Sequence, residues 1–243
     1  MSKLKFFIGC LSLVLLTTSC ASLALRILGA YKEDAKLNHI PHKEKSILYL
    51  PIHHIGKKAF YDDVRNKVDS LQKLGYVVYE EGVEPFIDNQ AVIDTAKFKY
   101  RKMIGHIITK DGYLDTINNT ILGTIKYNNK RGLINQPSYV ELGVDTTKSV
   151  RADLELHVLI QKFEDKYGVI KLETCDREIP LDSIFDLSCR YKDRKLRRRF
   201  NKYISFELRE EYLYETIKES SDDKILVIYG RHHYKNLKKK FRD

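Results

Sequence analysis

The segment from Ser46 to Glu81 constrains the fold of this 243-residue chain more than any other part of the sequence. Ser46–Ile52 and Tyr76–Glu81 are short, mostly apolar runs of the kind found in strands. Between them, from Lys57 to Leu74, apolar residues recur every three or four positions, which predicts a helix with one buried face that ends at Gly75. A strand, a helix and a second strand in close succession form a βαβ unit, so we expect a parallel sheet.

The remainder of the chain predicts further helices and one more confident strand. Lys224–Tyr229 is continuously apolar after its first residue, which is typical of a strand buried on both faces. Apolar spacing predicts helices over residues 112–126, 153–167 and 190–219, a strand over 168–173 and a short helix after Gly230. We therefore expect an α/β fold, with a largely parallel sheet flanked by helices and a helical insertion between the second and last strands.

Residues 1–20 have the pattern of a bacterial lipoprotein signal peptide. Two lysines precede an apolar run, Phe6 to Leu16, which is shorter than the roughly 20 residues that span a bilayer. The following Thr-Thr-Ser-Cys20 resembles a lipobox, whose Cys is acylated after cleavage. We expect a lipid on Cys20, a tether over 21–45, one domain over 46–243, and a place in the cell envelope. An uncleaved anchor that continues through Leu25 is the alternative, because residues 21–31 are not a polar linker.

The chain is strongly basic, with a formal net charge of +10, and much of the charge lies near the C-terminus in 190–202 and 235–242. Such stripes bind nucleic acid or anionic lipid head groups. No nucleic-acid recognition motif accompanies them, and an exported protein rarely meets nucleic acid. We interpret the stripes as solvated helix faces beside an anionic membrane and expect no nucleic-acid partner.

Cleavage of the signal peptide would leave two cysteines free of lipid, Cys175 and Cys189. An oxidising exported compartment permits a disulfide between them. Two buried free thiols are equally compatible with the sequence.

Polar residues gather where each of the three confident strands ends. They are the pairs His53-His54 and Glu80-Glu81 and the run Arg231–His233. Open parallel sheets bind ligands beyond the carboxyl ends of their strands, and a strand spacing of about 4.8 Å brings such side chains together. Successive strand residues point to opposite faces, so one member of each pair is expected to face a site. A single His at a strand end is usually structural, but three polar groups at equivalent places favour a site.

These strand ends also resemble those of a known group of proteins. Residues 52–61 and 75–83 resemble the opening of the TraB/PrgY/GumN-like family, relatives of the Tiki metalloproteases, and Gly230–His233 resembles its closing Gly-x-x-His. Asn135-Gln136, Ala152-Asp153 and the helix with Arg209, Leu213 and Ile217 are similar to the middle of the family. Two positions depart from the pattern, since Pro51 stands where Tiki-type members have Gly and Glu210 stands where the family has Asn.

The resemblance implies the fold of the erythromycin-esterase and ChaN-like group and, as in Tiki proteins, metal-dependent peptidase activity. Matched residue by residue, His54, Glu81 and His233 are the implied metal ligands, and Asp153 matches a further acidic position. Two imidazoles and a carboxylate hold a divalent ion such as Mn, Co or Zn and leave positions open for water and substrate.

Two further residues at the strand ends are candidates for catalysis. Glu80 is a candidate general base, and Arg231 a candidate to steady an oxyanion or a substrate carboxylate. The simpler interpretation of Arg231 is a surface charge or a salt bridge to Glu80.

Three functions remain open from the sequence. The one we expect is a membrane-tethered, metal-dependent hydrolase that acts on a peptide or another small substrate. The second is a lipoprotein that sequesters a peptide, haem or a metal without turnover. The third is a structural envelope protein whose polar clusters are incidental.

Overall fold

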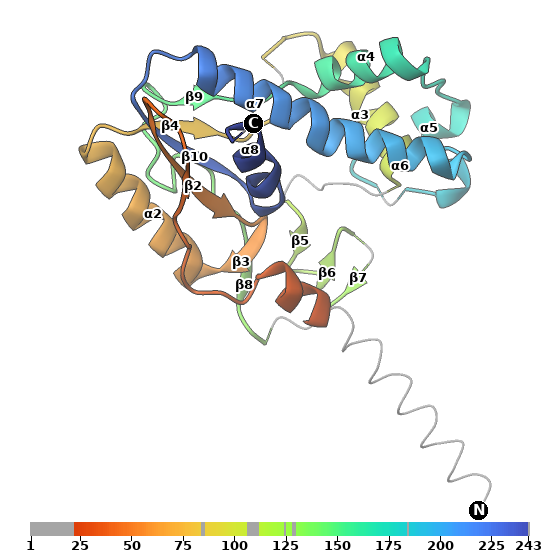
Figure 1. The fold of residues 1–243 in the computed structure, drawn as a ribbon. Coiled ribbons are helices and arrows are strands. Elements are labelled where there is room, and N and C mark those ends of the chain that lie inside the picture. Colours follow the sequence, from red (N-terminus) through yellow and green to blue (C-terminus); the bar gives the residue numbers. More distant parts are fainter. Residues whose placement is uncertain are drawn as a thin grey trace, which may run out of the picture.

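The computed structural model describes residues 22–83, 86–105, 112–123, 125–127, 130–183 and 185–242 (Figure 1). The expected signal peptide and the lipidation residue Cys20 lie outside the described residues. In chain order the elements are a helix over residues 22–28, β1 (Asn38–Ile40), β2 (Ser46–Ile52), β3 (Ile55–Lys57), α2 (Lys58–Lys73), β4 (Val77–Glu80), α3 (Gln90–Ile104), β5 (Leu114–Asp115), β6 (Thr120–Ile121), β7 (Ile125–Lys126), β8 (Leu133–Asn135), β9 (Val150–Arg151), α4 (Leu156–Tyr167), α5 (Thr174–Glu178), a 3₁₀ turn (Leu187–Cys189), α6 (Arg194–Lys202), a π-helical stretch (Tyr203–Glu207), α7 (Leu208–Glu219), β10 (Lys224–Gly230), a 3₁₀ turn (Arg231–His233) and α8 (Tyr234–Lys240).

The main sheet has the strand order β1-β2-β10-β4-β9 and is mostly parallel. β10 pairs in parallel with both β2 and β4, and β4 with β9, whereas β1 is antiparallel to β2. Ile225 to Tyr229 of β10 are all fully buried, and a strand without a polar face is suited to the centre of a covered sheet. The expected parallel α/β sheet is confirmed, with β10 inserted between the two strands of the βαβ unit.

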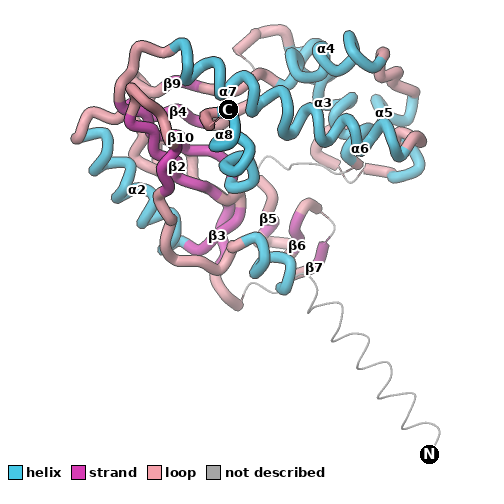
Figure 2. The backbone as a smooth tube through the Cα atoms, viewed as in Figure 1, coloured by secondary structure: helices cyan, strands magenta, loops and turns pink. Residues whose placement is uncertain are grey.

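Helices cover both faces of this sheet (Figure 2). Phe60, Val64 and Val68 of α2 pack on one face against residues such as Leu50 and Ile228. The other face is covered by α7 and α8, whose Leu213, Ile217 and Leu237 pack against Tyr49, Val227 and Tyr229. The result is a three-layer α/β/α arrangement, in which the alternation of side chains along each strand sends neighbouring residues to opposite cores.

The helices α3, α4 and α6 and the π-helical stretch form a separate lobe beside the sheet (Figure 1). Phe163 and Phe200 are fully buried at its centre, with ring centroids 4.8 Å apart. Cys175 and Cys189 form a disulfide that joins α5 to the 3₁₀ turn Leu187–Cys189. The structure thus selects the disulfide from the two cysteine states that the sequence left open.

Two predicted elements are wrong. The described residues of 112–126 form no helix: β5, β6 and β7 make a small antiparallel sheet, and Asn119 and Leu122 adopt positive φ in its turns. The helical spacing misled because the turns bring Leu114 and Ile121 to the same core, while Ile117 is 87 % exposed. Residues 168–173 form no strand, because the backbone N–H of Ile170 donates to the Glu164 side chain rather than to a sheet.

The segment expected to be a tether also differs in part from the expectation. Asn38–Ile40 form β1 at the edge of the main sheet, and Ile40 is fully buried. The helix over residues 22–28 packs through Leu25 onto the small sheet. Within the described ranges, no helix is long and apolar enough to cross a membrane.

Candidate functional site

The parallel register brings the ends of three strands to the same level. Leu50 of β2 and Glu80 of β4 are both aligned with Ile228 of β10. The residues that follow these strands, including His54, Glu81 and His233, therefore leave the sheet at the same end, which is called its edge below. Open parallel sheets bind their ligands beyond this end, where the strands have their carboxyl termini.

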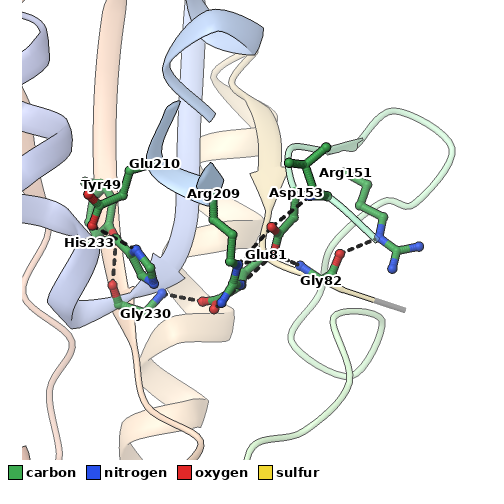
Figure 3. A network of polar contacts seen from close by, with 10 residues as sticks. Tyr49, Glu81, Gly82, Arg151, Asp153, Arg209, Glu210, Gly230 and His233 are labelled. Carbon is green, nitrogen blue, oxygen red and sulfur yellow. Dashed lines mark hydrogen bonds and ion pairs between the residues drawn. The ribbon is translucent and has the colours of Figure 1, made fainter. Parts of the chain in front are cut away.

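Glu81 is the central carboxylate of this edge (Figure 3). Its side chain is 10 % exposed, its Oε1 accepts from Arg209 Nη2 at 2.5 Å, and its Oε2 accepts from the backbone N–H of Gly230 at 2.5 Å. Burial on its own would raise the pKa of Glu81, but Arg209, His233, His54 and the Gly230 N–H outweigh it and hold the pKa below its ordinary value. Glu81 is consequently ionised at neutral pH.

Asp153 fixes the guanidinium that faces Glu81. Its side chain is fully buried and accepts two short bonds from Arg209, at 2.9 Å to Nε and 2.6 Å to Nη2. The backbone N–H groups of Gly82 and Leu154 donate to the same carboxylate at 3.0 and 2.9 Å. Such a bidentate arginine–carboxylate pair sets both the position and the plane of the guanidinium. Asp153 therefore holds Arg209, and its oxygens are already occupied.

A second buried pair lies on the other side of Gly230. His233 Nδ1 is 3.1 Å from Glu210 Oε1, and the two side chains are only 6 % and 5 % exposed. The point at which a Cβ on Gly230 would lie is 3.2 Å from Glu81 Oε2 and 3.4 Å from His233 Cδ2. Because Gly230 has no side chain, the His233 imidazole and the Glu81 carboxylate can both lie close to its backbone, one on each side, as Figure 3 shows.

A π-helical stretch precedes the two α7 residues of the site. Tyr203–Glu207 leads without a break into α7, so Arg209 and Glu210 follow it within one turn. Such stretches are rare and frequently occur at functional sites, because the extra residue turns the following side chains about the helix axis. Arg209 and Glu210 are neighbours in sequence, and one contacts Glu81 and Asp153 while the other contacts His233.

His54 is exposed and follows β2 at the same end of the sheet. Its ring stacks on Tyr113, with centroids 4.6 Å apart. A hydrogen bond with the Gln136 side chain acts to raise the pKa of His54. Desolvation by the surrounding protein lowers the pKa of His54, although Glu81 acts in the opposite direction. His54 is therefore neutral at pH 7.

The two residues proposed for catalysis from the sequence are not part of this network. Arg231 is exposed and donates to the backbone oxygen of Ile27 at 3.4 Å, on the side of His53. Burial and then Arg231 lower the pKa of His53 to about 4. Glu80 has one buried carboxyl oxygen with no partner among the described residues, and burial raises its pKa more than Arg151 lowers it.

The two α7 residues were absent from the candidates drawn from the sequence. Arg209 appeared there only through the resemblance, and Glu210 only as a departure from it. A signal for both was nevertheless present. Leu213 and Ile217 mark the buried face of α7, and counting back three or four positions from Leu213 gives Glu210 and Arg209. Charged residues at core positions of a helix indicate partners inside the protein.

A divalent ion suits the charge of this site but not its spacing. Glu81 and Asp153 share the Arg209 guanidinium, and Glu210 adds a third carboxyl group beside His233, so acidic groups outnumber the one guanidinium. However, the ligand atoms of His54, Glu81 and His233 do not all come within 4.8 Å of one another. Both Glu81 oxygens are also engaged by Arg209 and Gly230. In this arrangement the residues do not form a metal site, and we derive no chemical step through a metal.

One described group does meet that spacing, and it lies in the helical lobe. Glu173, Cys175 and Asp176 have ligand atoms within 4.8 Å of one another. Cys175 is bonded to Cys189, and Lys102 Nζ lies 2.6 Å from Asp176 Oδ2. A disulfide sulfur and a neighbouring ammonium group both disfavour a bound cation.

No protein-family model matches the chain, and no curated protein or solved structure is detectably similar to it. The resemblance to TraB/PrgY/GumN-like proteins is therefore carried by the residues quoted above and stays a prediction.

Proposed function

We propose that the protein is a membrane-tethered lipoprotein of the cell envelope, of the TraB/Tiki-like type, that hydrolyses peptides or related amides. The observation that carries the proposal is the buried Glu210–His233 pair beside the ionised Glu81. A carboxyl group that accepts from one imidazole nitrogen orients the ring and leaves the other nitrogen to accept a proton, which is the arrangement of a general base for water.

In this proposal His233 Nε2 takes a proton from the water that attacks the amide carbon, while Nδ1–H stays bonded to Glu210. The imidazole then returns that proton to the leaving amine as the C–N bond breaks, so the ring ends neutral. Arg209 supports the developing negative charge on the substrate oxygen, because its Nε and Nη2 are fixed by Asp153 and Glu81. Neutral His54, exposed at the same end of the sheet, supplies a further donor or acceptor. Each of these steps uses side chains of the chain itself.

One expectation from the sequence remains part of the proposal, and one is tested apart from it. The helices α3 to α7, which lie between β4 and β10, would be the helical insertion, with α7 supplying Arg209 and Glu210 to the site. The divalent ion would require Glu81 to turn away from Arg209 or Gly230. Metal content after purification without added metal, and activity with and without a chelator, test that ion separately from the hydrolysis.

The experiment compares two pairs of neighbouring residues in a peptide-library cleavage assay. His233→Ala and Glu210→Gln change the buried pair, whereas His232→Ala and Glu211→Gln change exposed neighbours. Loss of a general base lowers the rate by about 10²–10⁴-fold, so we expect that loss for His233→Ala, a smaller loss for Glu210→Gln and near wild-type rates for the controls. Circular dichroism checks that each variant is folded.

Two results would decide against this function. Equal rates for His233→Ala and His232→Ala would remove His233 from the reaction. Tight binding of a peptide, haem or a metal by wild type, with no cleavage of any library member, would favour the sequestering lipoprotein instead.

A further inference from the structure

Large apolar side chains are exposed on the helix over residues 22–28. Leu25 is 6 % exposed and packs into the protein, but Leu23 and Ile27 are 56 % and 69 % exposed and Leu28 is 48 % exposed. Leu23 and Ile27 are four residues apart and so share one side of the helix, roughly opposite Leu25. A surface helix of a soluble domain normally carries polar residues on that side.

The small sheet beside this helix adds to the same apolar surface. Leu25 packs with Leu114 and Ile121, which places the helix against β5 and β6, as Figures 1 and 2 show. Ile125 is the cross-strand partner of Ile121, so both side chains lie on the face of the sheet that meets the helix, and Ile125 is 46 % exposed. Ile117, in the turn between β5 and β6, is 87 % exposed. Contiguous exposed apolar residues mark an interaction surface.

The sequence next to this surface points to a lipid bilayer as its partner. Leu23 follows Cys20 by three residues, so their Cα atoms lie within about 11 Å of each other in any conformation. Acylation of Cys20 and an uncleaved anchor through Leu25 would both bring a membrane to this point. Arg26, on the helix, and Lys126, on β7, are exposed, as is Arg131, and cations beside apolar residues suit anionic lipid head groups.

We propose that the helix over residues 22–28 and the β5–β7 sheet form a membrane-docking face, made of Leu23, Ile27, Leu28, Ile117 and Ile125. On this proposal the protein is oriented on the bilayer and does not hang from a flexible tether. The proposal shares the membrane tether with the proposed function but is independent of hydrolysis.

Docking in this way would bring the edge of the main sheet close to the lipid. The helix contacts the residues that follow β2 and β10: the point at which a Cβ on Gly29 would lie is 3.2 Å from the His53 ring, and Arg231 donates to Ile27. The groups that follow these strand ends would then lie near the head groups. Its substrates would be reached at the membrane surface.

The absence of tryptophan from the chain allows a direct test. The full-length protein is purified from membranes and reconstituted into vesicles of phosphatidylcholine and phosphatidylglycerol, with or without acyl-brominated lipid, which quenches nearby tryptophan. Ile125→Trp places the probe on the docking face, far in sequence from Cys20. Leu187→Trp is the control, because Leu187 is 61 % exposed in the helical lobe, whose apolar cluster is separate.

We expect brominated lipid to reduce the fluorescence of Ile125→Trp by about half, since side chains of interfacial elements enter the head-group and acyl boundary, and to leave Leu187→Trp unchanged. Ile117→Trp gives a second probe if Ile125→Trp does not fold. Quenching of neither probe, or equal quenching of probe and control, would overturn the proposal. Unquenched probes in a protein that cross-links as a dimer would assign the face to a second copy of the chain. Intact mass and peptide cleavage report on lipidation and hydrolysis separately.

Discussion

Replacing Asp153 with Asn tests how much the buried ionic network contributes to the free energy of unfolding. The change keeps the size of the side chain but removes its charge and one acceptor oxygen. Asp153 is fully buried, accepts from Nε and Nη2 of Arg209 and from the Gly82 N–H, and Arg209 itself is only 13 % exposed. Removing one partner from a buried pair leaves the other charge uncompensated, which costs about 3–5 kcal/mol. The amide NH₂ of Asn would also face N–H donors rather than bond to them.

The matched control is Asp62→Asn. Asp62 pairs with Lys58 at 2.7 Å along α2, but the two side chains are 54 % and 76 % exposed. An exposed pair of this spacing contributes about 0.3–0.5 kcal/mol, so the control should unfold almost like wild type. Urea unfolding followed by far-UV circular dichroism gives both free energies. The reasoning would be refuted if Asp153→Asn lowered the free energy of unfolding by less than about 1 kcal/mol, or by as much as the control. Either result would mean that the charges of Asp153 and Arg209 do not depend on each other for compensation inside the protein.

Two further predictions concern stability. The pKa of His53 is lowered to about 4, so the unfolded chain takes up a proton more readily than the folded one as pH falls from the ordinary value of 6.5. The stability that neutral His53 supplies should thus be present above pH 6.5 and decline toward pH 4. His53→Gln should flatten this part of the pH dependence of the free energy of unfolding. An unchanged profile would mean that His53 does not cause that pH dependence. Replacing Cys175 and Cys189 with Ser opens a loop with a sequence separation of 14 residues, which should lower the free energy of unfolding by about 3 kcal/mol in urea; an unshifted midpoint would mean that the crosslink does not restrict the unfolded chain.

The parallel sheet was predictable because the apolar composition of its strands indicates that they are buried. Ile225–Tyr229 has no polar face, and the repeating apolar positions of α2 demand one buried side, so sequence alone specifies a covered sheet with a helix on it. The small sheet β5–β7 was not predictable by the same means. Each of its strands is two residues long, so periodicity has too few positions to separate strand from helix, and turns with positive φ decide the outcome.

The order of strands also lay beyond periodicity. Adjacent elements of a βαβ unit often pair, yet β10 lies between β2 and β4 although it is distant from both in sequence. Its central position agrees with its burial. Of β2, β4 and β10, only β10 has five successive buried residues. A comparison of the strands with one another therefore carries information that no single strand contains.

The gathering of polar groups in the candidate site could be predicted as far as the carboxyl end of the sheet, while the contacts among those groups could not. Polar residues that follow three parallel strands in register must leave the sheet at the same end, and His54, Glu81 and His233 all lie there. Which group faces which depends on α7, whose Arg209 and Glu210 enter from another layer. The desolvation of these charges is costly, and a well-packed apolar core of similar volume would be as stable. Natural sequences break such local rules mainly at functional sites. The two charged residues at core positions of α7 are therefore the strongest physical argument for the chemistry proposed at this end of the sheet.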